Sequence, residues 1–285
     1  MKKIGKTPLI RLKEFEKFIH TSARIYAKME SKNPFGSIKD RVALKIIEKA
    51  QNEKLINNNT CIIEATSGNM GIALAGISQI LGYKSKIIMP ENMSEGRKKL
   101  ILNYGAELVL TSSNLGMGGA ITKAQEIYKT TNNCYYCDQF NNLASIEAHI
   151  STTAPEIYEE LNGNIYMGIC GIGTGATITG LGKYLKSINP TINIIGILPR
   201  IYPHKIQGIG AGFIPPLLNM NFIDQIIDVD DEESFYEMDK INNIEGIGVG
   251  ISSGAVIAGL KRLLITSNFE NKNIVLVFPD GDDRY

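Results

Sequence analysis

A glycine- and threonine-rich segment carries residue types and a spacing that point to chemistry. Gly171-Ile172-Gly173-Thr174-Gly175-Ala176-Thr177 follows an apolar run and opens a helical pattern. Glycines let the backbone approach an anion, the first N–H groups of a helix point toward it, and threonine hydroxyls add donors. The segment predicts a phosphate-binding loop formed by Gly173, Thr174, Gly175, Ala176 and Thr177, and a plain strand-to-helix turn remains an equal alternative.

The glycine segment does not match the common nucleotide-binding loops. Its spacing is not G-x-G-x-x-G, and the following strand ends in Ile197-Leu198 without the acidic residue that would bind a ribose. No Lys-Ser or Lys-Thr pair follows it, so it is not a Walker loop either. A smaller phosphate-bearing ligand fits better.

Lys39 is a second candidate for chemistry. It lies at the start of a helix whose apolar stripe contains Val42, Ile46, Ile47 and Ala50. Positive charge is unfavourable at a helix N-terminus, whereas a neutral amine there suits a Schiff-base lysine. Taken alone, Lys39 would be a surface lysine. Together with a small-phosphate loop it suggests pyridoxal 5′-phosphate, whose aldehyde needs a lysine and whose phosphate needs such a loop.

Two further motifs are weaker signals for chemistry. Gly250–Gly254 matches the G-x-S-x-G pattern of serine hydrolases, with Ser252 as the nucleophile. That triad needs a histidine downstream, but the histidines, His20, His149 and His204, all precede Ser252. Ser252 and Ser253 more simply cap a helix over 255–264.

The cysteines indicate neither zinc nor redox chemistry. Cys134 and Cys137 form a lone C-x-x-C without a second pair or a nearby histidine, so we expect buried thiols and no metal site. Four cysteines in 285 residues do not form a disulfide framework, which favours a reducing cytoplasm.

The elements that must position these residues alternate along the chain. Short apolar runs, each followed by a turn and a helical pattern, predict strands over 61–65, 86–89, 107–110, 135–138, 165–169, 193–197, 225–229 and 274–278. Such alternation indicates an α/β fold with mostly parallel sheets covered on both faces, and the length allows two sheets. A TIM barrel competes, but the irregular stretch 199–222 and the lack of eightfold regularity disfavour it.

Composition excludes several partners. A formal net charge of +1 removes the electrostatic argument for nucleic acid or an anionic membrane. The N-terminal segment has no apolar region of a secretory signal, and no apolar run reaches the roughly 18 residues of a membrane span.

Ten motifs occur in order along nearly the whole chain and carry a specific resemblance. They are Gly5–Leu9, Asn33–Arg41, Glu64–Gly71, Met89–Ser94, Tyr104–Leu108, Asp138–Phe140, Gly171–Thr177, Gln207–Phe213, Gly250–Gly254 and Pro279-Asp280. On these motifs the chain resembles the cysteine synthase (O-acetylserine sulfhydrylase) and cystathionine β-synthase family of fold-type II pyridoxal-phosphate enzymes.

The resemblance implies a fold of two interlocked doubly wound domains, similar to tryptophan synthase β. Residues 40–145 would form a smaller, mobile domain with a loop for the substrate carboxylate. Residues 1–39 and 146–285 would form a larger domain with the phosphate loop. A small amino-acid substrate and a homodimer are also implied.

The resemblance assigns roles to residues of this chain. Lys39 would form the internal aldimine, Asn69 would bond the pyridine 3′-oxygen, Gly173–Thr177 would bind the phosphate, and Ser252 would contact the ring nitrogen. A serine at that nitrogen leaves the ring unprotonated and favours β-elimination and β-replacement through an aminoacrylate. The substrate carboxylate would be held by the loop residues Thr66, Ser67, Asn69 and Met70 and by Gln139.

Three features depart from the family pattern. Leu198 stands where many members end a strand with Glu, and the segment to His204 is shortened. Met70 replaces a threonine of the carboxylate loop, which removes a hydroxyl donor. Asp230 stands where the family more often has a small hydroxyl or amide residue. An acid there complements the dipole of a helix over 232–242, but near the cofactor it would act as a general base for water and repel bisulfide.

These departures leave several reactions open. The first is a cysteine hydroxyl-lyase, which converts L-cysteine and water to L-serine and hydrogen sulfide, with Lys39 and Asp230 as catalytic residues. The second is a cysteine synthase acting on O-acetyl-L-serine and sulfide. A serine hydrolase using Ser252 is the alternative of another class.

Overall fold

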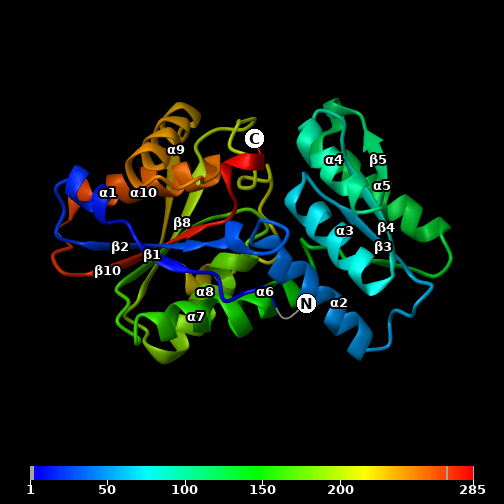
Figure 1. Cartoon of the computed structure of the whole chain (residues 1–285), viewed down its shortest axis with the longest axis horizontal. Coiled ribbons are helices and arrows are strands. Elements are labelled where there is room, and N and C mark those ends of the chain that lie inside the picture. Colours follow the sequence, from blue (N-terminus) through cyan, green and yellow to red (C-terminus); the bar gives the residue numbers. More distant parts are fainter. Residues whose placement is uncertain (1–2, 268, 285) are drawn as a thin grey trace. The chain divides into compact units, whose positions relative to one another are not determined.

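The computed structural model describes residues 3–267 and 269–284. The chain folds into two compact units. Unit 1 contains the chain up to Ile38 together with Ile146–Asp283, and unit 2 contains Lys39–Ser145 together with Arg284. Each unit holds one sheet, which is the two-sheet α/β arrangement that the alternating pattern predicts (Figure 1).

Unit 1 is built on a six-stranded sheet in the order β1-β2-β10-β7-β8-β9. Only the β1–β2 pair is antiparallel. The strands are β1 (Leu9–Arg11), β2 (Arg24–Met29), β7 (Met167–Gly171), β8 (Asn193–Pro199), β9 (Gln225–Val229) and β10 (Asn273–Phe278). Its helices are α1 (Lys13–Phe18), α7 (Ala154–Glu160), α8 (Ala176–Ile188), α9 (Asp231–Glu245) and α10 (Ile251–Thr266).

Both faces of this sheet are covered, as its strand sequences require. In β10, Ile274, Leu276 and Phe278 belong to the core formed with α1, α9 and α10. The alternate residues Val275 and Val277 belong to the core formed with α7 and α8. A strand that is apolar on both faces is typical of a parallel sheet between two helical layers.

Unit 2 is built on a parallel four-stranded sheet in the order β5-β4-β3-β6. The strands are β3 (Cys61–Ala65), β4 (Lys84–Pro90), β5 (Glu107–Thr111) and β6 (Cys134–Tyr136). The helices are α2 (Lys39–Asn52), α3 (Asn69–Leu81), α4 (Glu95–Asn103) and α5 (Gly116–Thr130). Ala120 and Ala124 of α5 pack against Ile63 and Ala65 of β3, so α5 covers one face.

The segment between the two sheets differs from the prediction. The sequence predicts a helical stretch broken at Pro155, but α6 (Ala144–Ala148), a π-helical turn (His149–Thr153) and α7 follow one another without a break. Pro155 is the second residue of α7 and lies inside this continuous stretch, so its missing N–H removes one helical hydrogen bond but does not end the helix.

The helix after β9 and the helix after Gly250 also start earlier than predicted. α10 begins at Ile251 with Gly250 as its N-cap residue, so Ser252 and Ser253 lie inside the helix. The prediction that these serines cap it is wrong.

Among the described residues, no helix combines the length and the apolar character needed to cross a membrane.

Candidate active site

Lys39 is the first residue of α2 in unit 2. Desolvation lowers the pKa of its amine from 10.5 to about 8, and the nearby Glu64 carboxylate acts in the opposite direction. Near neutral pH a sizeable fraction of this amine is therefore neutral, which a nucleophilic lysine requires.

The segment between β3 and α3 forms a turn that is closed by its own side chains. Thr66, 2% exposed, accepts a hydrogen bond from the Gly68 N–H at 3.0 Å. Gly68 adopts φ +153°, and a Cβ there would lie 2.4 Å from Cδ of Arg97. Arg97 in turn donates to the Ser67 carbonyl at 3.4 Å. The positive φ of Gly68 and the nearby Arg97 side chain both favour glycine at this position.

Two predicted substrate residues of unit 2, Asn69 and Met70, directly follow this turn as the first residues of α3. Asn69 begins α3 directly after Gly68, where helix N–H groups face outward. Met70 is 1% exposed, and its side chain belongs to the buried face of α3. The thioether that replaces the family's threonine is thus a packing group in this unit.

Gln139 follows β6 and lies beside the carboxyl end of β3. Its Nε2 donates to Oε1 of Glu64 and to the carbonyl of Ala65, both at 3.2 Å. Glu64 is 1% exposed, and burial raises the pKa of its carboxyl to about 8, with Asp138 contributing. The sequence analysis did not select Glu64, although an acid in the apolar strand Cys-Ile-Ile-Glu-Ala was a usable signal.

The glycine loop of unit 1 joins β7 to α8. A Cβ on Gly173 would lie 2.4 Å from the Gly208 carbonyl oxygen, and a Cβ on Gly175 would lie 2.7 Å from the Leu218 nitrogen. Gly175 also adopts φ +82°, a left-handed conformation that glycine accepts readily. Both glycines are therefore required by the backbone, and the loop delivers the chain to the N-terminus of α8.

The hydroxyls of the loop are oriented by contacts within unit 1. Oγ1 of Thr174 accepts from the Ala176 N–H at 3.4 Å. Oγ1 of Thr177 lies 3.2 Å from Nε2 of His149, and Nδ1 of that ring lies 2.9 Å from Oγ1 of Thr153. His149 is 1% exposed and sits in the π-helical turn. This histidine therefore supports the loop through Thr177. The sequence did not predict that role.

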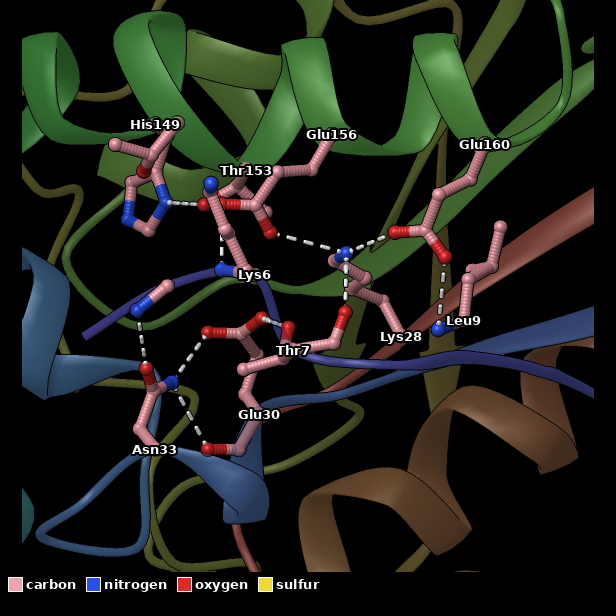
Figure 2. A network of polar contacts seen from close by, with 12 residues as sticks. Lys6, Thr7, Leu9, Lys28, Glu30, Asn33, His149, Thr153, Glu156 and Glu160 are labelled. Atoms are coloured by element: carbon pink, nitrogen blue, oxygen red, sulfur yellow. Dashed lines mark hydrogen bonds and ion pairs between the residues drawn. The ribbon is translucent and has the colours of Figure 1, made fainter. Parts of the chain in front are cut away.

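The same region of unit 1 holds a buried polar network (Figure 2). Lys28, fully buried, contacts Glu156 at 3.0 Å and Glu160 at 2.6 Å and donates to the Thr7 carbonyl at 2.6 Å. Thr7 also donates to Glu30 at 2.6 Å through its hydroxyl. These contacts attach the N-terminal segment to β2 and α7.

Comparisons with known proteins agree over the whole chain. Residues 1–280 match the family model described as "Pyridoxal-phosphate dependent enzyme". The chain is 43% identical to the cysteine synthase of Buchnera aphidicola subsp. Schizaphis graminum, over 99% of this chain and 92% of that protein. It is 40% identical to cysteine synthase A of Escherichia coli K12, over 99% and 91%. The chain belongs to the cysteine synthase family of pyridoxal-phosphate-dependent enzymes.

Solved structures of similar proteins have the same fold as this chain. A hydrogen sulfide-producing enzyme from Fusobacterium nucleatum superposes with a TM-score of 0.95 at 38% identity, covering 100% of this chain and 98% of that one. Cysteine synthase from Entamoeba histolytica superposes with a TM-score of 0.94 at 36% identity, covering 100% and 87%. The protein is therefore a pyridoxal-phosphate enzyme of β-elimination and β-replacement chemistry.

The residues present fit the cofactor of this cysteine synthase family member. Lys39 offers an amine whose pKa is lowered to about 8. Gly173 and Gly175 leave no room for a Cβ, and the loop leads into the N-terminus of α8, where backbone N–H groups can bind an oxyanion. An aldehyde and a phosphate are the two groups that this donor set suits.

Asp230 lies at the carboxyl end of β9, directly before α9. Its side chain is 45% exposed, and its Oδ2 lies 3.3 Å from Arg200 and 3.5 Å from Arg262. The side chain makes no cap hydrogen bond to α9. In parallel α/β sheets, ligands bind outside the carboxyl ends of the strands. The glycine loop after β7 and Arg200 after β8 share that edge with Asp230.

Ser252 does not have the surroundings of a hydrolase nucleophile. It is 1% exposed in the first turn of α10. Both ring nitrogens of His149 contact threonine hydroxyls, and His204 contacts the Gly210 carbonyl at 2.8 Å. The family membership and these partners remove the support for the serine-hydrolase alternative.

The thiols of this family member are free. Cys137 and Cys170 are buried, and Cys61 and Cys134 are partly exposed. Within the part of the chain that the structure describes, no group of three or more His, Cys, Asp or Glu side chains could hold a metal ion.

Proposed function

We propose that the protein converts L-cysteine and water to L-serine and hydrogen sulfide. The observation that carries the proposal is Asp230, a carboxylate at the ligand-binding edge of the unit 1 sheet. Water needs a general base to act as a nucleophile, whereas bisulfide is already anionic and would be repelled by a carboxylate. The similarity to the hydrogen sulfide-producing enzyme of Fusobacterium nucleatum supports the same reaction.

A second solved neighbour supports the role of an acid in such chemistry. It is an Asp-to-Asn mutant of a hydrogen sulfide-producing enzyme in complex with an α-aminoacrylate intermediate, 36% identical to this chain with a TM-score of 0.91. Replacing an aspartate in that protein is compatible with retention of the intermediate. We propose that Asp230 performs the later, water-adding half of the reaction here.

We propose that these residues of the chain bind pyridoxal phosphate. Lys39 would bind its aldehyde, Gly173–Thr177 its phosphate, Asn69 its ring hydroxyl oxygen and Ser252 its ring nitrogen. When bound, the cofactor supplies an electron sink for the charge left at the substrate α-carbon.

The chain's own residues would then divide the work. The turn Thr66–Asn69 and Gln139 bind the substrate carboxylate. Lys39 takes the α-proton, which its lowered pKa permits near neutral pH, and the sulfur leaves the β-carbon as bisulfide. Asp230 takes a proton from water as the water oxygen bonds to the β-carbon, and Lys39 returns the proton to the α-carbon. Asp230 then releases the water proton to solvent, and bisulfide takes up a proton to become hydrogen sulfide.

Both arginine contacts of Asp230 are made by the same oxygen, Oδ2. This leaves Oδ1 as the atom that accepts the proton from water. The arginines would hold the carboxylate in place without occupying the reacting oxygen.

The test is product analysis with L-cysteine as sole substrate. The wild-type protein should release serine and sulfide in equal amounts. Asp230→Asn should lower serine formation about 100-fold or more, the usual effect of a lost general base, while loss of the α-proton in deuterated water continues. Asp228→Asn, an exposed acid two residues earlier on the same strand, is the matched control and should resemble the wild type. Equal serine formation by Asp230→Asn and wild type would contradict the proposal.

Cysteine synthesis from O-acetyl-L-serine and sulfide is the second candidate. The curated relatives from Buchnera and Escherichia coli are cysteine synthases, which favours it. Brisk use of O-acetylserine together with no serine from cysteine would select this reaction.

We also infer from the family that the protein is a cytoplasmic homodimer and that unit 2 is the mobile domain. Light scattering on the loaded protein tests the homodimer, because it measures the molecular mass. If unit 2 moves when an amino acid binds, the radius of gyration measured by X-ray scattering should change.

A further inference from the structure

Glu64 lies near the carboxyl end of β3, close to the proposed substrate loop, and has no role in the proposed reaction. β3 and β6 are parallel neighbours in register Ile63↔Tyr136, and the Cys137 N–H extends the pairing by donating to the Ile63 carbonyl at 3.0 Å. Glu64 therefore lies beside the chain that leaves β6, just before the turn that starts at Thr66. Gln139 arrives at the same place from β6.

Three hydrogen bonds hold Gln139 in a specific orientation. Its Nε2 donates to Glu64 Oε1 and to the Ala65 carbonyl at 3.2 Å each, and its own backbone carbonyl accepts from the Ser145 hydroxyl at 3.2 Å. Both protons of the amide are thus engaged with acceptors of the protein. In this orientation the amide has no proton left for a substrate carboxylate.

Glu64 itself is under-bonded. Its Oε2 is buried and has no hydrogen-bond partner among the described residues. A carboxylate offers about four acceptor sites, so a buried one with a single bond is costly to ionise. A protonated Glu64 makes a weaker bond to Gln139, because charge-assisted hydrogen bonds are roughly twice as strong as neutral ones.

Few charged groups act on Glu64. Lys39 acts on it from the start of α2, and Asp138 acts on it from the chain after β6. Of the titratable groups in β6 and its extension, Tyr136 and Cys137 are the two whose pKa values Glu64 raises. Across the sheet its partner on β4 is Ile87, and α3 contains no charged residue. Because Ile63 and Ala65 face α5, the alternate residue Glu64 faces the other side of the sheet.

We infer that Glu64 is a positioning residue that competes with the substrate carboxylate for the amide of Gln139. Ionised Glu64 retains the Gln139 donor, and protonated Glu64 releases it to the substrate. The inference rests on the proposed binding of the substrate carboxylate by Gln139. It adds a pH-dependent control of substrate affinity that the catalytic residues do not provide.

The experiment measures binding of L-alanine, which has no leaving group, to the loaded protein through the change in cofactor absorbance. Glu64→Gln removes the ionisable competitor and preserves the shape of the side chain. At pH 9 it should bind L-alanine roughly 5- to 10-fold more tightly than the wild type, and at pH 6.5 the two should agree within about 2-fold. An affinity ratio that is constant from pH 6.5 to pH 9 would overturn the inference.

Two further variants keep the test specific. Asp138→Asn removes a charge that disfavours ionisation of Glu64 but leaves the contacts of Gln139 in place, so the loss of alanine affinity should begin at lower pH than in the wild type. Gln139→Leu should weaken binding and abolish the effect of Glu64→Gln, because the effect acts through the amide. If Gln139→Leu binds L-alanine like the wild type, the assignment of Gln139 fails and the inference fails with it.

The outcomes also separate the inference from the proposed reaction. Weaker binding by Gln139→Leu together with a pH-independent effect of Glu64→Gln rejects the role of Glu64 alone. Alanine binding does not depend on which nucleophile adds, so the absence of serine from cysteine would reject the reaction and leave this test standing.

Discussion

At the scale of single residues, burial gives two groups of opposite charge similar affinities for a proton. Desolvation lowers the pKa of Lys39 to about 8 and raises that of Glu64 to about 8. A base that must accept a proton and then return it works best with a pKa near the operating pH. Unit 2 thus prepares the lysine by removing water, and it keeps a buried acid close enough to affect it.

The lowered pKa of Lys39 predicts the pH dependence of its reactivity in the apoprotein. A lowered pKa means that the neutral amine dominates above about pH 8, so acetylation by trace acetic anhydride should rise with pH and level off above that value. Glu64 raises this pKa, so Glu64→Gln should shift the midpoint to lower pH. Quantification of the Lys39 peptide by mass spectrometry measures both effects. A rate that keeps rising toward pH 10.5 would contradict the desolvation of the amine, and loading with pyridoxal phosphate should suppress labelling.

Several site residues could be selected from the sequence because their neighbours in the chain explain them. Lys39 opens a helix, and the Thr66–Asn69 and Gly171–Thr177 segments are local turns. Glu64 stands out as an acid in an apolar strand, but the roles of Glu64 and His149 could not be predicted in this way. Their partners Gln139 and Thr177 lie 75 and 28 residues away, and only the pairing of strands and helices brings them together.

At the scale of elements, the parallel strands were predictable because each is a short apolar run between turns. The strands over 61–65 and 225–229 match their predicted bounds, and helix α4 ends at Asn103 before Gly105 as predicted. The antiparallel pair β1–β2 was not predicted from the sequence. β1 has three residues, and β2 contains Arg24 and Lys28, whose charges resemble an exposed segment. Lys28 is buried only because Glu156 and Glu160 of α7 pair with it (Figure 2).

The glycine loop between β7 and α8 should tolerate no side chain at its left-handed position. Gly175→Ala combines positive φ with a contact of 2.7 Å to the Leu218 nitrogen, so we expect a loss of about 1–3 kcal/mol in unfolding free energy and a loss of phosphate binding. Gly246→Ala is the matched control, since Gly246 has φ +66° in the same unit with nothing within 4 Å of the added Cβ. It should lose stability but keep phosphate affinity. Urea unfolding and calorimetric titration with inorganic phosphate measure the two quantities, and equal phosphate affinities in both variants would contradict the role of the loop.

At the scale of the whole molecule, the proposed cofactor contacts come from segments that are far apart in the chain. Lys39 begins α2, and Gly173–Thr177 lies between β7 and α8 and at the start of α8. A ligand that binds only the folded state stabilises it by about 4 kcal/mol at a free concentration of 1,000 times its Kd. For a chain of this size, each kcal/mol raises Tm by about 2–4 °C. Loading with pyridoxal phosphate should therefore raise Tm by roughly 8–16 °C, as measured by scanning calorimetry.

The contributions of the two units to this stabilisation can be separated by variants. Inorganic phosphate occupies only the glycine loop, so its effect on Tm should be smaller, should persist in Lys39→Ala and should vanish in Gly175→Ala. Lys39→Ala should lose the additional stabilisation that pyridoxal phosphate gives over phosphate, because the aldehyde has no amine to join. If Lys39→Ala gains as much from pyridoxal phosphate as the wild type does, then Lys39 is not the residue that holds the cofactor, and the catalytic roles proposed for it must be assigned elsewhere.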